Sequence, residues 1–405
     1  MKTKSKIPAL RFKGFTDAWE QRKLGEIAEF NPKSDLPDEF EYVDLESVVG
    51  TEMVFHRTEN KASAPSRAQR VAKTGDVFFQ TVRPYQRNNY LFSMPYENYV
   101  FSTGYAQMRP KINAAFLMCF LQTESFVQNV LDNCTGTSYP AINSSDLSNL
   151  KISLPILKSE QSKIGKLISN LDHLITLHQR KCDQTKELKK TMLQKMFPKK
   201  GETVPEIRFP EFTDAWEECK LGEVGNTFTG LSGKTKEDFG HGEGKFITYM
   251  NVFSNPVADL DGLEGVEIDN KQFQVKAGDV LFTTSSETPE EVGMSSMWLG
   301  NADNIYLNSF CFGYRPTIEF DNYYLAFMFR SAPIRKKFQL LAQGISRYNI
   351  SKNKVMEMSI PVPSIEEQEK IGSFFKHLDT LIALHQSKCD SLKELKKTLL
   401  RQLFV

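Results

Sequence analysis

The chain has 405 residues, of which 40% are hydrophobic and 25% are charged, and its formal net charge is +1. This length is enough for two or more domains with cores of their own, and no apolar run approaches the roughly 20 residues that span a membrane. The near-neutral charge argues against a small, strongly basic DNA-binding module that acts alone.

The six cysteines are scattered along the chain without Cys-x-x-Cys spacing. This usage predicts thiols in a reduced interior rather than a disulfide framework. The first residues, MKTKSKIPALRF, carry charge but have no apolar segment behind them, which is not the pattern of a secretory signal. These features together predict a cytoplasmic protein without a membrane partner.

The beginning of the chain returns in its second half. Ile7–Glu26 is repeated as Val204–Glu223 with 13 of 20 positions identical, and Ser159–Phe197 is repeated as Glu366–Phe404 with 23 of 39 identical. A repeat of this length is too long for a solenoid. We therefore predict a tandem duplication, with globular units at 1–157 and 201–363, each followed by a long helix at 158–200 and 364–405.

Each globular unit mixes strand and helix patterns, which predicts the α+β class. Short β-branched and aromatic runs predict strands at 42–49, 76–82, 99–108 and 150–157 in the first unit, and at 246–253, 279–284 and 305–314 in the second. Helical patterns cover 114–133 and 323–341, and polar or glycine-rich composition predicts loops at 61–69 and 229–244.

The two long helices each carry apolar residues at intervals of three and four and contain no proline. A helix of about 39 residues is roughly 60 Å long, which is too long for the core of one compact domain. Neither helix can bury its apolar face alone. We therefore predict that they pack as an antiparallel coiled coil with pseudo-twofold symmetry, with His178 and His385 facing each other near its middle.

Histidine and cysteine recur at helical spacing in both helices. His178 with Cys182 and His385 with Cys389 could suggest a zinc site. In an antiparallel pair centred on the histidines, however, each cysteine lies about 6 Å away along its own helix in opposite directions. The four side chains would not converge, so no metal site is predicted.

Other catalytic motifs are incomplete. The segment 230–235 ends like a phosphate-binding loop, but Phe228 stands where its first glycine should be. Pro37-Asp38 with Glu59 and Lys61 matches a loose nuclease pattern, yet the latter two lie in a polar loop without a counterpart in the second unit. An amino-methyltransferase would need a Pro-Pro motif, and the chain contains none. We therefore predict no catalytic residues.

Charge is sorted along the sequence. Residues 61–90 carry six basic groups and one acid, residues 335–354 carry six basic groups and no acid, and residues 255–303 carry ten acids and two lysines. The basic segments could meet phosphate. Guanidinium groups, amides and aromatic rings are also the side chains that read base edges. The candidate DNA-contacting residues are Arg67, Arg70, Arg83, Tyr85, Arg87, Asn88 and Tyr139 in the first unit, and Lys234, Thr284, Ser286, Arg347, Tyr348 and Asn349 in the second.

These repeated motifs resemble one protein family. The domain starts at 16–26 and 213–223, the Gly-Asp-Val strands at 75–77 and 278–280, and the Leu-Asp-x-Leu-Ile runs at 171–175 and 378–382 are similar to those of the specificity subunit of Type I restriction-modification systems. The resemblance covers essentially the whole chain.

The resemblance implies two target recognition domains, each of which reads one half of a split site in double-stranded DNA. It implies that the helices act as a ruler for the gap and dock two methyltransferase subunits, and through them the restriction subunits. S-adenosylmethionine, ATP and Mg²⁺ would be used by those partners, and this subunit would be non-catalytic and hold no cofactor. The competing hypotheses are a self-contained DNA methyltransferase or nuclease with duplicated recognition arms, and a scaffold with two lobes that do not bind DNA.

Overall fold

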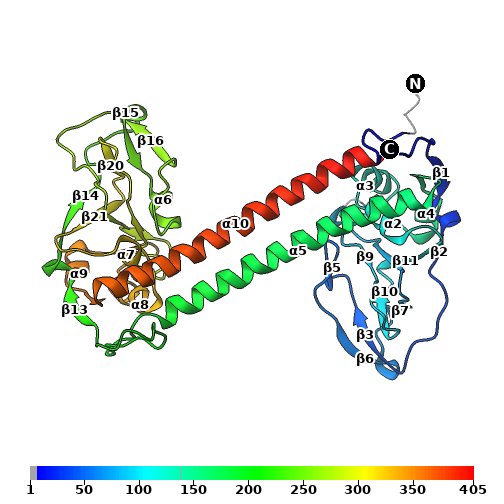
Figure 1. Ribbon diagram of the computed structural model, residues 1–405, viewed down its shortest axis with the longest axis horizontal. Coiled ribbons are helices and arrows are strands. Elements are labelled where there is room, and N and C mark those ends of the chain that lie inside the picture. The colour runs from blue at the N-terminus through cyan, green and yellow to red at the C-terminus, as the bar shows by residue number, and fades with distance from the viewer. Residues whose placement is uncertain (1–6, 137) are drawn as a thin grey trace. The chain divides into compact units, whose positions relative to one another are not determined.

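The computed structural model describes residues 7–136 and 138–405. The chain forms two compact units (Figure 1). Unit 1 runs to Arg180 and is completed by Gln386–Val405, and unit 2 is Lys181–His385. Each unit therefore contains one globular repeat, part of the helix α5 (Lys158–Lys195) and part of the helix α10 (Ile365–Leu403).

Unit 1 is built around two four-stranded sheets. One sheet has the strand order β6-β3-β10-β7 and the other β2-β11-β8-β9, and the pairs β1-β12 and β4-β5 lie beside them. The strands are β1 (Glu20–Lys23), β2 (Ala28–Phe30), β3 (Glu39–Val43), β4 (Val48–Val49), β5 (Glu52–Met53), β6 (Arg57–Asn60), β7 (Ala68–Val71), β8 (Val77–Gln80), β9 (Tyr90–Leu91), β10 (Tyr99–Ser102), β11 (Tyr105–Pro110) and β12 (Lys151–Leu154). The helices are α1 (Leu24–Ile27), α2 (Ala114–Leu121), α3 (Glu124–Leu131) and α4 (Ser144–Asn149), with short 3-10 turns η1 (Lys61–Ser63) and η2 (Pro84–Gln86).

Unit 2 repeats this plan with different details. Its sheets have the orders β14-β21-β17-β19 and β16-β15-β20, and the pairs β13-β23 and β18-β22 complete it. The strands are β13 (Glu217–Lys220), β14 (Gly225–Thr229), β15 (Phe239–Ile247), β16 (Leu263–Val266), β17 (Val280–Thr283), β18 (Ser285–Ser286), β19 (Ser295–Met297), β20 (Ile305–Leu307), β21 (Cys311–Pro316), β22 (Tyr348–Asn349) and β23 (Ser359–Val362). The helices are α6 (Tyr249–Ser254), α7 (Asn322–Met328), α8 (Ala332–Leu341) and α9 (Lys352–Met356), with η3 (Leu221–Glu223) and η4 (Lys236–Asp238).

The predicted α+β class is confirmed, with corrections to the elements. The predicted strand over 42–49 is interrupted, because residues 44–47 separate β3 from β4. Each long predicted strand that ends in Arg-Pro is two strands, β10 and β11 or β20 and β21, and each predicted helix after it is two helices. The interruption between α2 and α3 has a local cause, because Thr123 caps α3 by accepting a hydrogen bond from the Phe126 amide. The prediction of a strand over 246–253 is wrong after Ile247, since Thr248 caps α6 through the Asn251 amide.

The predicted loop at 229–244 is also wrong in part. Strand β15 begins at Phe239 and pairs with β16 across a register shift before Gly244. Gly240 and Gly242 have φ values of +85° and +90°, so the strand is bulged there. Glycines inside a bulged strand give a loop-like composition, which is why the sequence pattern missed it.

The long helices run antiparallel within each unit. In unit 1 the Lys396 Nζ lies 2.5 Å from an Asp172 carboxylate oxygen, and the Cys389 thiol lies 3.9 Å from the Ile175 carbonyl. The residue number in α5 rises from 172 to 175 while the residue number of its partner in α10 falls from 396 to 389, so the two helices run antiparallel.

Unit 2 contains the same contacts shifted by 207 residues. Lys189 pairs with Asp379 at 2.5 Å, and the Cys182 thiol lies 3.8 Å from the Ile382 carbonyl. The predicted antiparallel packing is therefore confirmed within each unit. The predicted pairing of His178 with His385 joins residues of different units, so it stays a prediction.

A phenylalanine at the end of each helix completes the core. In unit 1 the Phe404 ring lies 6.1 Å from Trp19, 5.5 Å from Phe116 and 5.7 Å from Phe120, measured between ring centroids. In unit 2 Phe197 takes the same place beside Trp216 and Tyr324. Unit 1 is therefore built from the first repeat together with the last residues of the chain.

A buried glutamate fixes the start of each helix. The carboxylate of Glu160, which is 1% exposed, accepts two hydrogen bonds from Arg11 at 2.7 and 2.9 Å and one from the Trp19 indole at 3.4 Å. Glu367 repeats this arrangement with Arg208 at 2.7 and 2.8 Å and Trp216 at 3.0 Å. The repeated Arg-Phe, Trp-Glu and Glu-Gln motifs of the sequence are therefore structural.

Each helix also approaches its globular repeat closely at a glycine. A Cβ at Gly165 would lie 2.8 Å from the Phe116 amide nitrogen, and a Cβ at Gly372 would lie 2.1 Å from an Asp321 carboxylate oxygen. Only glycine allows this distance between α5 and α2, and between α10 and α7.

We predict that Glu160→Ala lowers the free energy of unfolding of unit 1 by about 3 kcal/mol, because the mostly buried Arg11 guanidinium and the Trp19 indole lose their acceptor. Urea unfolding followed by tryptophan fluorescence measures this change. The matched control is Glu26→Ala, which removes an exposed glutamate paired with Arg22 and is expected to leave the unfolding midpoint unchanged. Equal midpoints for the two variants would contradict this role of Glu160.

Candidate nucleic-acid interface

A buried aspartate braces the central strand in each unit. Asp76, which precedes β8, accepts hydrogen bonds from the Lys73 amide at 2.9 Å and from Arg109 at 2.9 and 2.8 Å. Asp279, which precedes β17, accepts the same bonds from the Lys276 amide and from Arg315, all at 2.7 Å. The repeated Gly-Asp-Val motif and the Arg-Pro motif therefore hold one another and fix where the strand begins.

A threonine after this strand sets the position of two surface loops. The amide and hydroxyl of Thr81 donate to the Gly104 carbonyl at 2.9 and 2.8 Å, and its carbonyl accepts from the Ile142 amide at 3.0 Å. Thr284 makes the same three bonds, with the Phe310 carbonyl and with the Ile350 amide. The two units thus share one hydrogen-bonded frame, and the residues that follow each threonine are equivalent in position.

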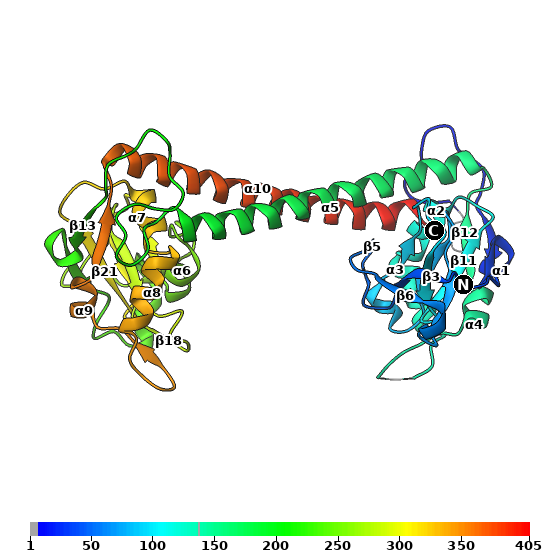
Figure 2. The ribbon, with the colours of Figure 1, turned by 90° about the horizontal axis from the view of Figure 1, so that it is seen from below.

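The frame presents Arg83 and Tyr139 together in unit 1. The Arg83 guanidinium lies 4.3 Å from the centroid of the Tyr139 ring, and its amide donates to the Pro140 carbonyl at 2.8 Å. Tyr139 is 63% exposed and the nearby Tyr85 is 49% exposed. Tyr85 belongs to η2, whereas Tyr139 lies in the loop between α3 and α4, which projects from the side of unit 1 away from the long helices (Figure 2). A stacked cation and ring on a projecting loop can meet a nucleic-acid groove.

The side chains of Arg87 and Asn88 do not join Arg83 and Tyr139 but bond to other parts of unit 1. Arg87 donates to the Gln122 carbonyl at 3.3 Å, at the junction of α2 and α3, and Gln122 donates back to the Arg87 carbonyl at 3.1 Å. The side-chain carbonyl of Asn88 accepts from the Gly50 amide at 2.8 Å. The structure therefore brings Arg83, Tyr85 and Tyr139 to one region and places Arg87 outside it.

The other two arginine candidates of unit 1 lie at β7, an edge strand of the sheet β6-β3-β10-β7. Arg67 is exposed just before β7, and Arg70 lies within β7. Burial lowers the pKa of Arg70, and its Nε atom has no hydrogen-bond partner among the residues that the structure describes. The assignments of both to DNA stay predictions.

In unit 2 three of the predicted residues already have intramolecular partners. The Thr284 hydroxyl is used by the shared frame, Ser286 is 7% exposed and donates to Glu291 at 3.2 Å, and Lys234 pairs with Asp269 at 3.1 Å. Tyr348 and Asn349 form β22, whereas Arg347 is exposed on the loop before it. Contact of these residues with DNA stays a prediction.

Ile345, in the same loop, is a candidate DNA-contacting residue that the sequence pattern did not predict. Ile345 is 95% exposed, beside Gly344, which has a φ of +140°, and two residues before Arg347. The loop projects from unit 2 on the side away from the long helices (Figure 2). The sequence does contain a signal for this residue: an apolar β-branched side chain lies between glycine and serine in a basic segment, where a polar residue is expected in a solvated loop.

Arg335 is a correction to the predicted basic segment 335–354. Its guanidinium donates to the carbonyls of Gly293, Glu290 and Val292 at 2.7, 2.8 and 2.5 Å. Burial lowers its pKa to about 10, so the group keeps its charge at neutral pH but is engaged inside the unit. Arg335 is therefore not available to phosphate.

Within the described part of the chain, no group of three or more His, Cys, Asp and Glu side chains is placed to hold a metal ion. In the same residues no helix combines the length and the apolar composition that crossing a bilayer requires.

The shared frame with unlike loops agrees with a match to a known family. The family model of the Type I restriction modification DNA specificity domain matches residues 16–187 and 213–394, one domain for each repeat. The chain belongs to this family. The matches include the Trp, Gly-Asp-Val and Glu-Gln motifs whose structural roles are described above.

Individual relatives agree with this membership. The Type I restriction enzyme MjaVIII specificity subunit of Methanocaldococcus jannaschii is 24% identical over 310 residues, which cover 69% of this chain and 66% of that protein. The Type I restriction enzyme HindI specificity subunit of Haemophilus influenzae is 26% identical over 174 residues, which cover 40% of this chain and 36% of that protein. The crystal structure of a Type I restriction-modification system S subunit from M. genitalium has the same fold, with a TM-score of 0.57, 16% identity and coverage of 98% and 99% of the two chains.

Proposed function

We propose that this chain is the DNA specificity subunit of a Type I restriction-modification complex and that each unit reads one half of a bipartite site. The observation that carries the proposal is the frame shared by Thr81 and Thr284. In unit 1 the frame presents Arg83 with Tyr139. In unit 2 it places Arg347 at the position of Tyr139 and the buried Ser286 at the position of Arg83, and Ile345 is exposed two residues before Arg347. One scaffold with two chemically unlike loops is suited to two unlike half-sites.

The side chains support different base preferences. An arginine guanidinium can pair in bidentate fashion with O6 and N7 of guanine in the major groove, and an exposed apolar side chain can contact the C5-methyl group of thymine. Arg83 is held against the Tyr139 ring, which orients its fork. Ile345 is exposed at the other loop. We therefore assign guanine reading to the first loop and thymine-methyl contact to the second.

The chain's role in the complex is recognition rather than chemistry. Methylation and cleavage are assigned to two methyltransferase subunits and to restriction subunits, which would bring S-adenosylmethionine, ATP and Mg²⁺. The apolar side chains that α5 and α10 leave exposed, among them Leu177, Leu384 and Leu395, support docking of helices from those partners. The helices would also set the gap between the half-sites, and the complex would work in the cytoplasm, where its DNA is.

We predict that Arg83→Ala relaxes recognition at one base pair of one half-site by about 1–3 kcal/mol and leaves the other half-site unchanged, because a bidentate base contact is lost. Methylation of duplexes with single base-pair changes by the assembled complex measures this. Arg22→Ala, which removes an exposed arginine on β1, is the matched control and should behave as wild type. Unaltered discrimination by Arg83→Ala at all positions would contradict the assignment.

We predict that deoxyuridine in place of one thymine of the half-site read by unit 2 weakens methylation by the wild-type complex, because the thymine methyl group is removed. The same replacement should have no effect on Ile345→Ser, which lacks the contacting side chain. Thymines of the other half-site serve as the control. A wild-type complex that is indifferent to deoxyuridine at every thymine of that half-site would exclude this role of Ile345.

A further inference from the structure

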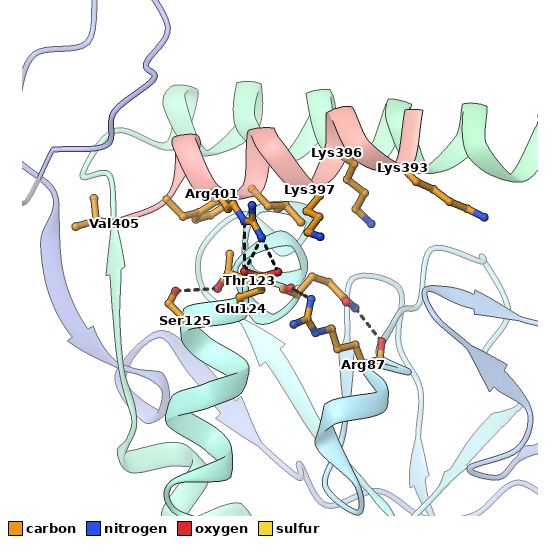
Figure 3. A pocket seen from close by; sticks show the side chains of 12 residues that line it. Arg87, Thr123, Glu124, Ser125, Lys393, Lys396, Lys397, Arg401 and Val405 are labelled. Carbon is orange, nitrogen blue, oxygen red and sulfur yellow. Dashed lines mark hydrogen bonds and ion pairs between the residues drawn. The ribbon is translucent and has the colours of Figure 1, made fainter. Parts of the chain in front are cut away.

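Unit 1 contains a cavity of about 740 Å³ beside the end of α10. Figure 3 shows it between three lysines of α10, the start of α3 and the side chain of Arg87. Leu400, Phe404 and Val405 form its apolar wall. The other side chains are mainly cationic.

The cations of this cavity outnumber the acids. Two of the cations form salt bridges. Arg401 pairs with Glu124 at 3.3 Å, and Lys396 pairs with Asp172 at 2.5 Å. Within the described residues, this leaves Arg87, Lys393 and Lys397 in or at the cavity without an acidic partner.

These cations act on the same carboxylate. The pKa of Glu124 is lowered first by its bonds to Arg401 and further by the charges of Lys397 and Arg87. Glu124 is thus already paired, and it neutralises one charge of the group. The remaining charges would repel one another less if an anion lay among them.

Unit 2 does not form the same group, although α5 repeats the lysines as Lys186, Lys189 and Lys190. Gln194 stands at the place of Arg401, and Ala332 at the place of Glu124. At the place of Gln122, the guanidinium of Arg330 lies inside unit 2 and donates to the carbonyls of Ser295, Val252, Phe253 and Asn255. The cationic cavity is therefore a feature of unit 1 and not a consequence of the duplication.

We propose that this cavity binds a phosphate-bearing ligand, with Lys393, Lys397 and Arg87 as its cationic contacts. Three cations that form no ion pair among the described residues suit a compact group with two or more negative charges. Guanidinium forks and ammonium groups are the usual protein partners of phosphate oxygens. The phosphate can belong to a free polyphosphate or to the DNA backbone, and only the second source rests on the proposed function.

Thermal unfolding of the full chain with and without inorganic tripolyphosphate tests the site. The melting temperature of wild type should rise with tripolyphosphate, since a ligand that binds only the folded state stabilises it, and this rise should be lost in the double variant Lys393→Gln with Lys397→Gln. The matched control, Lys186→Gln with Lys190→Gln, removes the equivalent lysines of unit 2 and should keep the rise. The absence of a rise in wild type, or equal rises in all three proteins, would overturn the proposal.

Two further measurements identify the ligand. A glutamate-rich peptide at equal charge concentration should raise the melting temperature less than tripolyphosphate, and an equal rise would overturn the assignment to phosphate. The salt dependence of DNA binding then separates the two sources. Loss of two backbone contacts should reduce the slope of log K against log salt by about 2 in the Lys393 and Lys397 variant, whereas an unchanged slope assigns the site to a free phosphate compound.

This design separates the two proposals. If wild type shows no response to tripolyphosphate but the assembled complex still discriminates both half-sites, the cavity proposal fails and the proposed function stands.

Discussion

The buried carboxylate at the start of each long helix is the interaction on which the rest of the structure depends. Glu160 and Glu367 each join an arginine, a tryptophan and the first turn of a helix. This bond fixes the direction in which the helix leaves its globular repeat. A close helix contact at Gly165 and at Gly372 then follows, since a side chain there would collide with α2 or α7.

This arrangement makes each unit depend on both halves of the chain. Phe404 fills the space beside Trp19 and Phe116 in unit 1, and Phe197 fills the equivalent space beside Trp216. The backbone repeats the connection, because the Leu10 amide donates to the Gln402 carbonyl and the Ile207 amide to the Lys195 carbonyl, both at 2.9 Å. The first repeat without the end of α10 would lack part of its core.

The same frame leaves the recognition loops free to differ. The bonds around Asp76, Asp279, Thr81 and Thr284 involve backbone groups and side chains that both units share, so they fix where a loop begins and ends without fixing what it presents. Loops held by a rigid scaffold are the usual place for binding specificity. This division of roles explains why the sequence repeats strictly at the motifs and poorly between them.

The sequence predicted the features that depend on local pattern and on duplication. The two long helices, their antiparallel direction within each unit and the strands after the Gly-Asp motifs all follow from periodicity and repeated letters. The interface was harder to predict, because a basic residue in a sequence does not reveal its partners. Arg335 is bound to carbonyls and Ser286 is buried, while Ile345 is exposed. Only tertiary contacts separate these cases.

The most direct test of the account is to map the methylated bases in the genome of a host that carries this chain with the proposed methyltransferase subunit. Two unlike recognition units on one repeated scaffold predict a bipartite motif, with two different half-sequences separated by a gap of fixed length. A single unbroken motif, a palindromic motif with identical half-sites, or no methylation that depends on this chain would contradict the account.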